Sequence, residues 1–317
     1  MRFGQMLVYT TSGRRTGRYE DANPFDMVVA AARVAEEVGF DSLWYPDHFM
    51  FEEEDGDPEV EVLECFTMLA GIAARTERIR FGEYVAGAPY RNPGLMAKMY
   101  TTLDIIGHGR SIIGIGAAWH REEFQAYGWP FLPPRERIER LEDYIQIITR
   151  MLTEPRASYE GTHLSIEDTI NYPRPVQQPR PPIMIGGGGE RYTLRLVARY
   201  ADMYNTWGGD PARVRHKFEV LRQHCQEIGR PYDEITRSNH VTMLIARDER
   251  ELETKKQRYT WFRSEPPLIG TPEAIINGIK EYAAAGSQYL IFDLVDWHDP
   301  ESTYLFAEKV MPAVRDL

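Results

Sequence analysis

The stretch IMIGGGGERYTLRLVARYADMYN, residues 183–205, decides the fold that we expect. It opens with an apolar run typical of a buried strand, which ends in four consecutive glycines. A segment with helical periodicity follows over residues 190–200, and the short apolar strand ADMYN comes directly after it. A strand, a helix and a further strand of these lengths predict a parallel βαβ unit.

The same alternation extends in both directions along the chain, and it repeats about eight times. Several helices carry clear boundary signals: Asn23-Pro24 and Asp210-Pro211 supply a cap and a proline at helix starts, and Gly39 stands at a helix end. The predicted strands are residues 3–9, 42–46, 79–85, 111–116, the run before the glycines, 201–205, 235–246 and 288–294. Eight such units predict an α/β fold, a (β/α)₈ TIM barrel formed by a single domain over residues 1–317. An open doubly wound sheet is the alternative.

One segment, residues 155–182, departs from this rhythm. It holds six prolines around ASYEGTHLSIED, which predicts a hairpin with its turn at Glu160-Gly161. Proline blocks helix interiors and central strands, so we interpret the segment as an insertion and not as a barrel element. Its role stays open between a lid or binding loop and a plain surface excursion.

Composition and charge exclude several classes of function. The 317 residues carry a net charge of −11, which disfavours nucleic acid and anionic membranes as partners. The two cysteines, Cys65 and Cys225, match no metal or redox spacing, and no apolar run reaches the length of a membrane span. The N-terminus does not resemble a signal peptide. We therefore expect a cytoplasmic protein with a small-molecule substrate and no bound metal.

The four glycines need a reason, because glycine in a regular element costs roughly 0.5–1 kcal/mol relative to alanine. They join a strand to a helix start, where free N–H groups and the helix dipole favour an anion, so we predict a phosphate site there. Five arginines lie nearby, at positions 174, 180, 191, 195 and 199. Arg191, in the first turn, is best placed to reach an anion, whereas Arg195 and Arg199 fit a solvated helix face better.

Other candidates come from the carboxyl ends of the strands, where barrel enzymes place their active sites. Asp47-His48 is a polar pair among aromatics, and His48 suits an acid or a hydrogen-bond donor. The first strand contributes Tyr9, Thr10 and Thr11 and the last Asp293 and Asp296, while Glu83, Trp119 and His120 are each ambiguous between site and structure. The chain has no GxSxG, HExxH or Walker motif, so difficult chemistry would require an organic cofactor.

Four stretches together resemble the bacterial luciferase-like family. They are SLWYPDHF (42–49), YRNPGLMAKMYTTLD (90–104), GRSIIGIGAAWHREEFQAYGWPF (109–131) and PRPPIMIGGGGERYTLRLVARYADMYN (179–205). The similarity runs over nearly the whole chain, is specific only in combination, and is strongest to the branch of probable coenzyme F420-dependent oxidoreductases.

The resemblance implies a barrel that holds a deazaflavin or flavin at the strand ends, with a non-proline cis peptide matching Tyr84–Val85 behind the ring. It also implies that the Asp-His pair lies beside the ring and that the protein is a homodimer. We therefore predict F420 as the cofactor, with FMN as the alternative, and Asp47, His48 and Trp119 as the catalytic residues. The predicted cofactor-binding residues are Tyr84, Val85, Gly87, Gly116, Ala117, Ala118, His120, Gly186, Gly187, Gly188, Gly189 and Arg191.

The chain departs from the family pattern at one position. Sugar-phosphate dehydrogenases of the family that use the deazaflavin carry a glutamate acid where Trp119 stands here, so the proton donor is left unassigned. Trp119 and Tyr84 would instead give aromatic walls that suit an apolar or planar substrate. The expected reaction is hydride transfer. The alternatives are an FMN-dependent monooxygenase, a non-catalytic flavin-binding protein and, without the resemblance, a phosphate-binding sugar isomerase.

Overall fold

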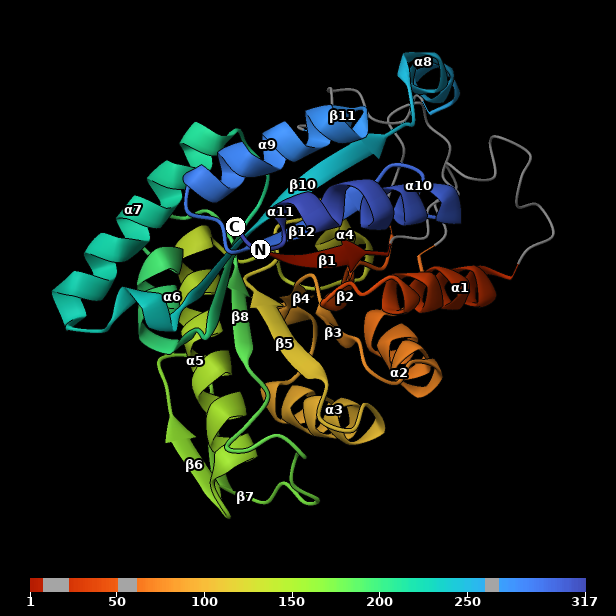
Figure 1. Ribbon diagram of the computed structural model, residues 1–317. Helices are drawn as coiled ribbons and strands as arrows, with labels where there is room; N and C mark the ends of the chain where they lie inside the picture. The colour runs from red at the N-terminus through yellow and green to blue at the C-terminus, as the bar shows by residue number, and fades with distance from the viewer. Residues whose placement is uncertain (8–22, 51–61, 260–267) are drawn as a thin grey trace.

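Eight parallel strands close into a barrel and follow one another around the ring in sequence order (Figure 1). The computed structural model describes residues 1–7, 23–50, 62–259 and 268–317. The barrel strands are β1 (Arg2–Met6), β2 (Ser42–Tyr45), β3 (Arg80–Glu83), β5 (Ser111–Gly116), β8 (Ile183–Gly186), β9 (Met203–Thr206), β10 (Thr236–Ile245) and β12 (Tyr289–Leu294). Strand β1 pairs with both β2 and β12, which closes the ring. The predicted (β/α)₈ TIM barrel is confirmed, and the open-sheet alternative is excluded.

Helices surround the strands and begin where the sequence signals predict. Asn23 Oδ1 accepts from the Phe25 N–H at 2.9 Å, and Asp210 Oδ1 accepts from the Arg213 N–H at 2.8 Å. Each cap satisfies an N–H group that has no partner within its own helix. The helices of the ring are α1 (Pro24–Glu37), α2 (Cys65–Arg75), α3 (Pro93–Ile106), α5 (Pro134–Thr153), α6 (Thr193–Tyr200), α7 (Pro211–Ile228), α9 (Pro272–Ala284) and α10 (Pro300–Leu305).

Shorter elements complete the chain. They are β4 (Ala86–Gly87), η2 (Ala88–Tyr90), α4 (Arg121–Ala126), the strands β6 and β7 treated below, η3 (Tyr232–Glu234), α8 (Glu249–Arg258), β11 (Leu268–Gly270), the π-helix η4 (Phe306–Val310) and α11 (Met311–Val314). Strand β11 extends the sheet outside the barrel by pairing with β10. Of the helices in the described residues, none is both long and apolar enough to cross a lipid bilayer. Tyr9, Thr10 and Thr11 lie outside the described residues.

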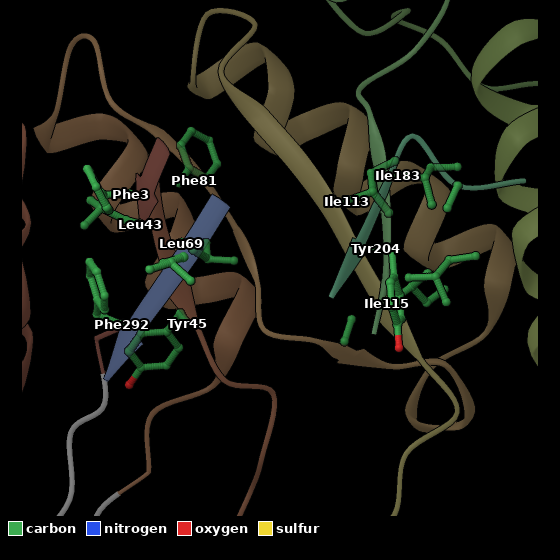
Figure 2. Close-up of a cluster of buried hydrophobic side chains, with 14 of the residues drawn as sticks. Phe3, Leu43, Tyr45, Leu69, Phe81, Ile113, Ile115, Ile183, Tyr204 and Phe292 are labelled. Atoms are coloured by element: carbon green, nitrogen blue, oxygen red, sulfur yellow. The ribbon is translucent and has the colours of Figure 1, made fainter. Parts of the chain in front are cut away.

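Two apolar layers stabilise the barrel, and neighbouring residues of one strand belong to different layers. On β2, Leu43 and Tyr45 join a large cluster that includes helix side chains such as Leu69, as Figure 2 shows. Trp44 between them joins a small cluster drawn almost entirely from strands, which is the barrel interior. The small cluster contains Met6, Trp44, Tyr84, Ile112, Met184, Met203, Tyr289 and Ile291.

The proline-rich insertion contains the predicted hairpin, β6 (Ala157–Glu160) paired antiparallel with β7 (Ser165–Thr169). The hairpin packs against the outside of α5, where Tyr159 donates to Asp143 at 3.0 Å. The chain then passes the amino-terminal end of β5, because the side chain of Gln177 donates to the carbonyl of Ser111 at 2.8 Å. This end of the barrel is opposite to the strand carboxyl ends, so the position favours a surface excursion over a lid.

Candidate active site

The chain bulges between β3 and β5 at the carboxyl end of the barrel. The Tyr84–Val85 peptide bond is cis, as the resemblance implied. Val85 fills the space that two glycines leave on β5 and β8: a Cβ added to Gly116 would lie 2.8 Å from Val85, and one added to Gly186 would lie 2.9 Å from it. These two predicted cofactor-binding glycines thus have a structural reason of their own, which is close packing of the bulge.

Glu83 anchors the start of the same bulge from a fully buried position. Its carboxyl accepts from the Gly114 N–H at 3.2 Å, where the β3–β5 ladder is interrupted. Burial raises the pKa of Glu83 to about 8, so the group is largely protonated at neutral pH. The ambiguity over Glu83 is resolved in favour of a structural role at the bulge.

Asp47 is buried and belongs to an ion-pair network. Its carboxylate accepts from the Arg91 guanidinium at 2.7 and 2.9 Å and from the Gly87 N–H at 2.9 Å. Arg91 also reaches Glu64 at 2.7 Å. Burial raises the pKa of Asp47, and the Arg91 guanidinium opposes that shift. Asp47 and Gly87, predicted to contact substrate and cofactor, therefore bind each other and fix the loops after β2 and β3.

His48 lies in a cluster that the sequence reading only partly found. Its Nδ1 is 3.3 Å from Oε2 of Glu123, a completely buried carboxylate on α4. The rings of Trp119 and His120 lie 5.7 and 5.8 Å from that of His48. Glu123 was missed because, within HREEF, it is indistinguishable from the polar first turn of a surface helix. The predicted residues His48, Trp119 and His120 are brought together.

The backbone beside Trp119 is shaped by a neighbouring arginine. Ala118 has a positive φ of 56°, which is uncommon for a residue with a side chain. Its carbonyl accepts from Arg137, whose guanidinium also lies 3.5 Å from the Ala117 carbonyl. The carbonyls of Ala117 and Ala118 are thus engaged by the protein itself, and the turn presents Trp119 with two thirds of its side chain exposed.

The glycine loop joins β8 to α6 as predicted, and its middle is open. Gly187 has φ 138°, a conformation that favours glycine, and its N–H donates to the Asn205 carbonyl at 3.1 Å. Gly188 and Gly189 are exposed, and their N–H groups donate to no acceptor within the described part of the chain. A Cβ on Gly188 would meet nothing closer than Lys217 at 3.9 Å. Unpaired N–H groups beside open space are what a phosphate requires, so the loop fits the predicted group.

The cations around this loop differ from those expected. Arg180 pairs with Asp202, Arg199 pairs with Glu142, and Arg174 donates to the Met151 carbonyl, so these three arginines are engaged elsewhere. Arg191 is exposed in the turn before α6, with its guanidinium 5.1 Å from the centre of the Tyr192 ring. Lys217 of α7, which the sequence does not indicate as part of the site, donates to the Gly188 carbonyl at 2.8 Å and to Glu190 at 2.6 Å. No local pattern links Lys217 to the loop, because 29 residues separate it from Gly188.

A third group of side chains gathers where β9 and β12 end beside the middle of β10. Trp207 is 59 % exposed and stacks on the buried His240 with ring centres 4.2 Å apart. Tyr84 lies beside both rings and donates to Asn205. Burial lowers the pKa of His240 to about 3 and raises that of Asp293 to about 7, so the imidazole stays neutral and the carboxyl titrates near neutrality. Asp296, by contrast, pairs with Lys255 at 2.7 Å and is structural.

Comparison with known proteins places this geometry in a family. The model of the luciferase-like monooxygenase family matches residues 1–265, which is most of the chain. The chain belongs to the luciferase-like monooxygenase family. It is 35% identical to an F420-dependent glucose-6-phosphate dehydrogenase of Microbacterium testaceum (strain StLB037), over 89% of this chain and 91% of that one. The resemblance predicted from the sequence is confirmed.

Solved structures of several enzymes share the fold of this family member. An F420-dependent secondary alcohol dehydrogenase, in complex with an F420-acetone adduct, has a TM-score of 0.82 at 18% identity and covers 99% of each chain. The oxygenating constituent of 3,6-diketocamphane monooxygenase from Pseudomonas putida, in complex with FMN, has a TM-score of 0.78 at 17% identity and covers 98% of each chain. These TM-scores support the barrel fold. Because the sequence identities are below 20%, the two structures do not decide which cofactor this chain binds.

Proposed function

We propose that this family member is an F420-dependent oxidoreductase that transfers a hydride between the cofactor and a small apolar or planar substrate. The observation that carries the proposal is the site itself in a chain 35% identical to an F420-dependent dehydrogenase. An open glycine loop, a bulge that packs Val85 against two glycines, and a histidine cluster all lie at the carboxyl ends of the barrel strands. The bound cofactor would supply a ring that gains or loses a hydride.

The protein's own residues would then divide the remaining work. The N–H groups of Gly188 and Gly189, with Arg191 nearby, would hold the cofactor phosphate. Tyr84 and Val85 would form the wall behind the ring. His48, supported by Glu123, would stabilise the charge that develops during transfer or exchange a proton with the substrate. Trp119 would exclude water and shape the pocket.

The proposed substrate class rests on Trp119. The relative in Microbacterium is named for a sugar phosphate. The resemblance to the family implies that such enzymes carry a glutamate where Trp119 stands in this chain. In this chain Trp119 lies beside His48 and is 66 % exposed. Its indole offers a broad apolar face with a single N–H donor. Such a face suits a planar or apolar molecule better than a doubly charged sugar phosphate.

An FMN-dependent monooxygenase is the second candidate, because the family description and the FMN-bound structure above both favour it. Catalysis distinguishes the two. We expect oxidation of reduced F420, without oxygen, when aliphatic or aromatic ketones are added, and little turnover of glucose 6-phosphate with oxidised F420. Oxygen-dependent product formation with reduced FMN alone would contradict the proposal. Homodimer assembly and a cytoplasmic location remain predictions.

A further inference from the structure

Glu123 connects three loops at the carboxyl end of the barrel. It is on α4, a six-residue helix at the surface, yet its carboxylate is completely shielded from solvent. Oε1 accepts from the N–H groups of Phe49 and Met50, and Oε2 accepts from Tyr90 and lies 3.3 Å from Nδ1 of His48. These donors come from the loop after β2 and from η2, so a single carboxylate organises the segment that carries His48.

The protonation of the groups around Glu123 follows from these contacts. Burial alone would raise the pKa of Glu123, but hydrogen bonds from His48, Tyr90 and the Phe49 N–H hold it below the ordinary value. Burial, and then the hydrogen bond to Glu123, raise the pKa of Tyr90, so this hydroxyl keeps its proton and donates. Glu123 is therefore an ionised group that can only accept hydrogen bonds.

An acceptor at 3.3 Å from Nδ1 determines where the imidazole proton resides. A neutral histidine carries one proton, and the nitrogen that faces a carboxylate holds it. We propose that Glu123 is the positioning residue of His48: it fixes the proton on Nδ1, so that Nε2 is the atom through which His48 exchanges a proton in the reaction. This rests on the proposed function, since it assigns the atom by which that histidine acts. The Nδ1–H stays on the Glu123 side throughout, while Nε2 gains and releases one proton.

The competing interpretation of this cluster is a metal site formed by His48, Glu123 and the neighbouring His120. Ligand atoms of His48, His120 and Glu123 all lie within 4.8 Å of one another. A metal that bound both Glu123 and Nδ1 of His48 would need the Nδ1 lone pair, so it would exclude the hydrogen bond proposed above. It would also compete for carboxylate oxygens that already accept from two backbone amides and the Tyr90 hydroxyl. The existing bonds therefore favour the positioning role.

The test reads the tautomer of His48 directly. Long-range ¹H–¹⁵N spectra of the full chain labelled with ¹⁵N-histidine distinguish Nδ1–H from Nε2–H rings, and the His48→Ala variant assigns the signal among the eight histidines. We expect Nδ1–H in the wild type. In Glu123→Gln the side-chain NH₂ can face Nδ1, which should convert the ring to Nε2–H and lower turnover by about 10²-fold with unchanged F420 affinity. Glu122→Gln is the matched control, because Glu122 is the neighbouring exposed carboxylate on α4 and lies 3.6 Å from His120.

Each outcome decides one question. An Nε2–H ring in the wild type overturns the proposal without any variant, even if Glu123→Gln fails to fold. An unchanged tautomer in a folded Glu123→Gln protein overturns it as well, and so does stoichiometric Zn²⁺ binding that shifts both His48 and His120. If the tautomer behaves as expected but the protein neither binds F420 nor turns over with it, Glu123 still positions His48 and the proposed function is wrong.

Discussion

The clearest stability effect expected in this site comes from Asp47, whose carboxylate is fully buried and accepts three hydrogen bonds. In Asp47→Asn the amide cannot accept both guanidinium bonds, and within the described residues the carboxylate that still pairs with Arg91 is that of Glu64, which is 37% exposed. Removing one partner of a buried ion pair costs about 3–5 kcal/mol, because the remaining charge loses its compensation. For 317 residues the unfolding entropy near the transition is about 0.7 kcal/mol/K, so the Tm should fall by about 4–7 °C.

A double-mutant cycle separates this effect from general damage. Arg91 packs with its guanidinium 4.6 Å from the Phe66 ring, so Arg91→Met removes the charge and keeps apolar contact. The free energies of unfolding, measured by urea titration, should show that the double variant loses less than the sum of the single variants, by about 1–3 kcal/mol. If Asp47→Asn is within about 1 kcal/mol of the wild type but turnover is lost, Asp47 takes part in the chemistry and our reasoning about its structural role fails.

Three further predictions concern the proposed catalyst, the phosphate site and the bulge. His48→Ala should lower turnover by about 10²–10⁴-fold and leave the F420 dissociation constant nearly unchanged, and full activity would remove His48 from the chemistry. Gly188→Ala should fold normally, since a Cβ there meets no atom closer than 3.9 Å. It should weaken F420 binding at least about tenfold, because the methyl group occupies the space of the phosphate. Equal affinity in the variant would place the phosphate elsewhere. The pKa of Glu83 is about 8 in the folded protein against an ordinary 4.5, so between these values the folded state holds the extra proton. The free energy of unfolding should therefore fall as pH rises from 5 to 8, by at most about 1.4 kcal/mol per pH unit. Glu83→Gln should flatten this slope. An identical slope in the variant would contradict the protonated state assigned to Glu83.

Much of the fold could be predicted from local patterns. The strand over residues 111–116 and the helix from Pro211 to Ile228 have the boundaries expected, because apolar runs, a cap and a proline act over a few residues. The first strand is predicted over residues 3–9; it runs from Arg2 to Met6, and residues 8 and 9 lie outside the described residues. Neighbouring strands of a parallel barrel also follow one another in sequence, so the order around the ring needs no long-range information.

The site was less predictable because its bonds join residues far apart in sequence. The sequence predicts Asp47 as a catalytic residue next to His48, and only the structure shows that Arg91, 44 residues later, binds its carboxylate. Glu123 contacts His48 across 75 residues of sequence, and Lys217 contacts Gly188 across 29 residues. Both lie on helices whose sequence patterns are those of ordinary surface helices. The sequence predicts Gly116 and Gly186 as cofactor contacts, and the structure adds that Val85 packs tightly against both glycines, a contact that the sequence does not indicate.

Whether this barrel binds F420 is tested most directly by a binding titration. Purified protein without cofactor would be titrated with F420 and with FMN, each oxidised and reduced, with Gly188→Ala as the control that retains the fold. We expect tight F420 binding, much weaker FMN binding, and loss of F420 affinity in the variant. Preference for FMN would place the protein among the monooxygenases of the family, and binding of neither cofactor would show that the barrel is not an F420-dependent enzyme.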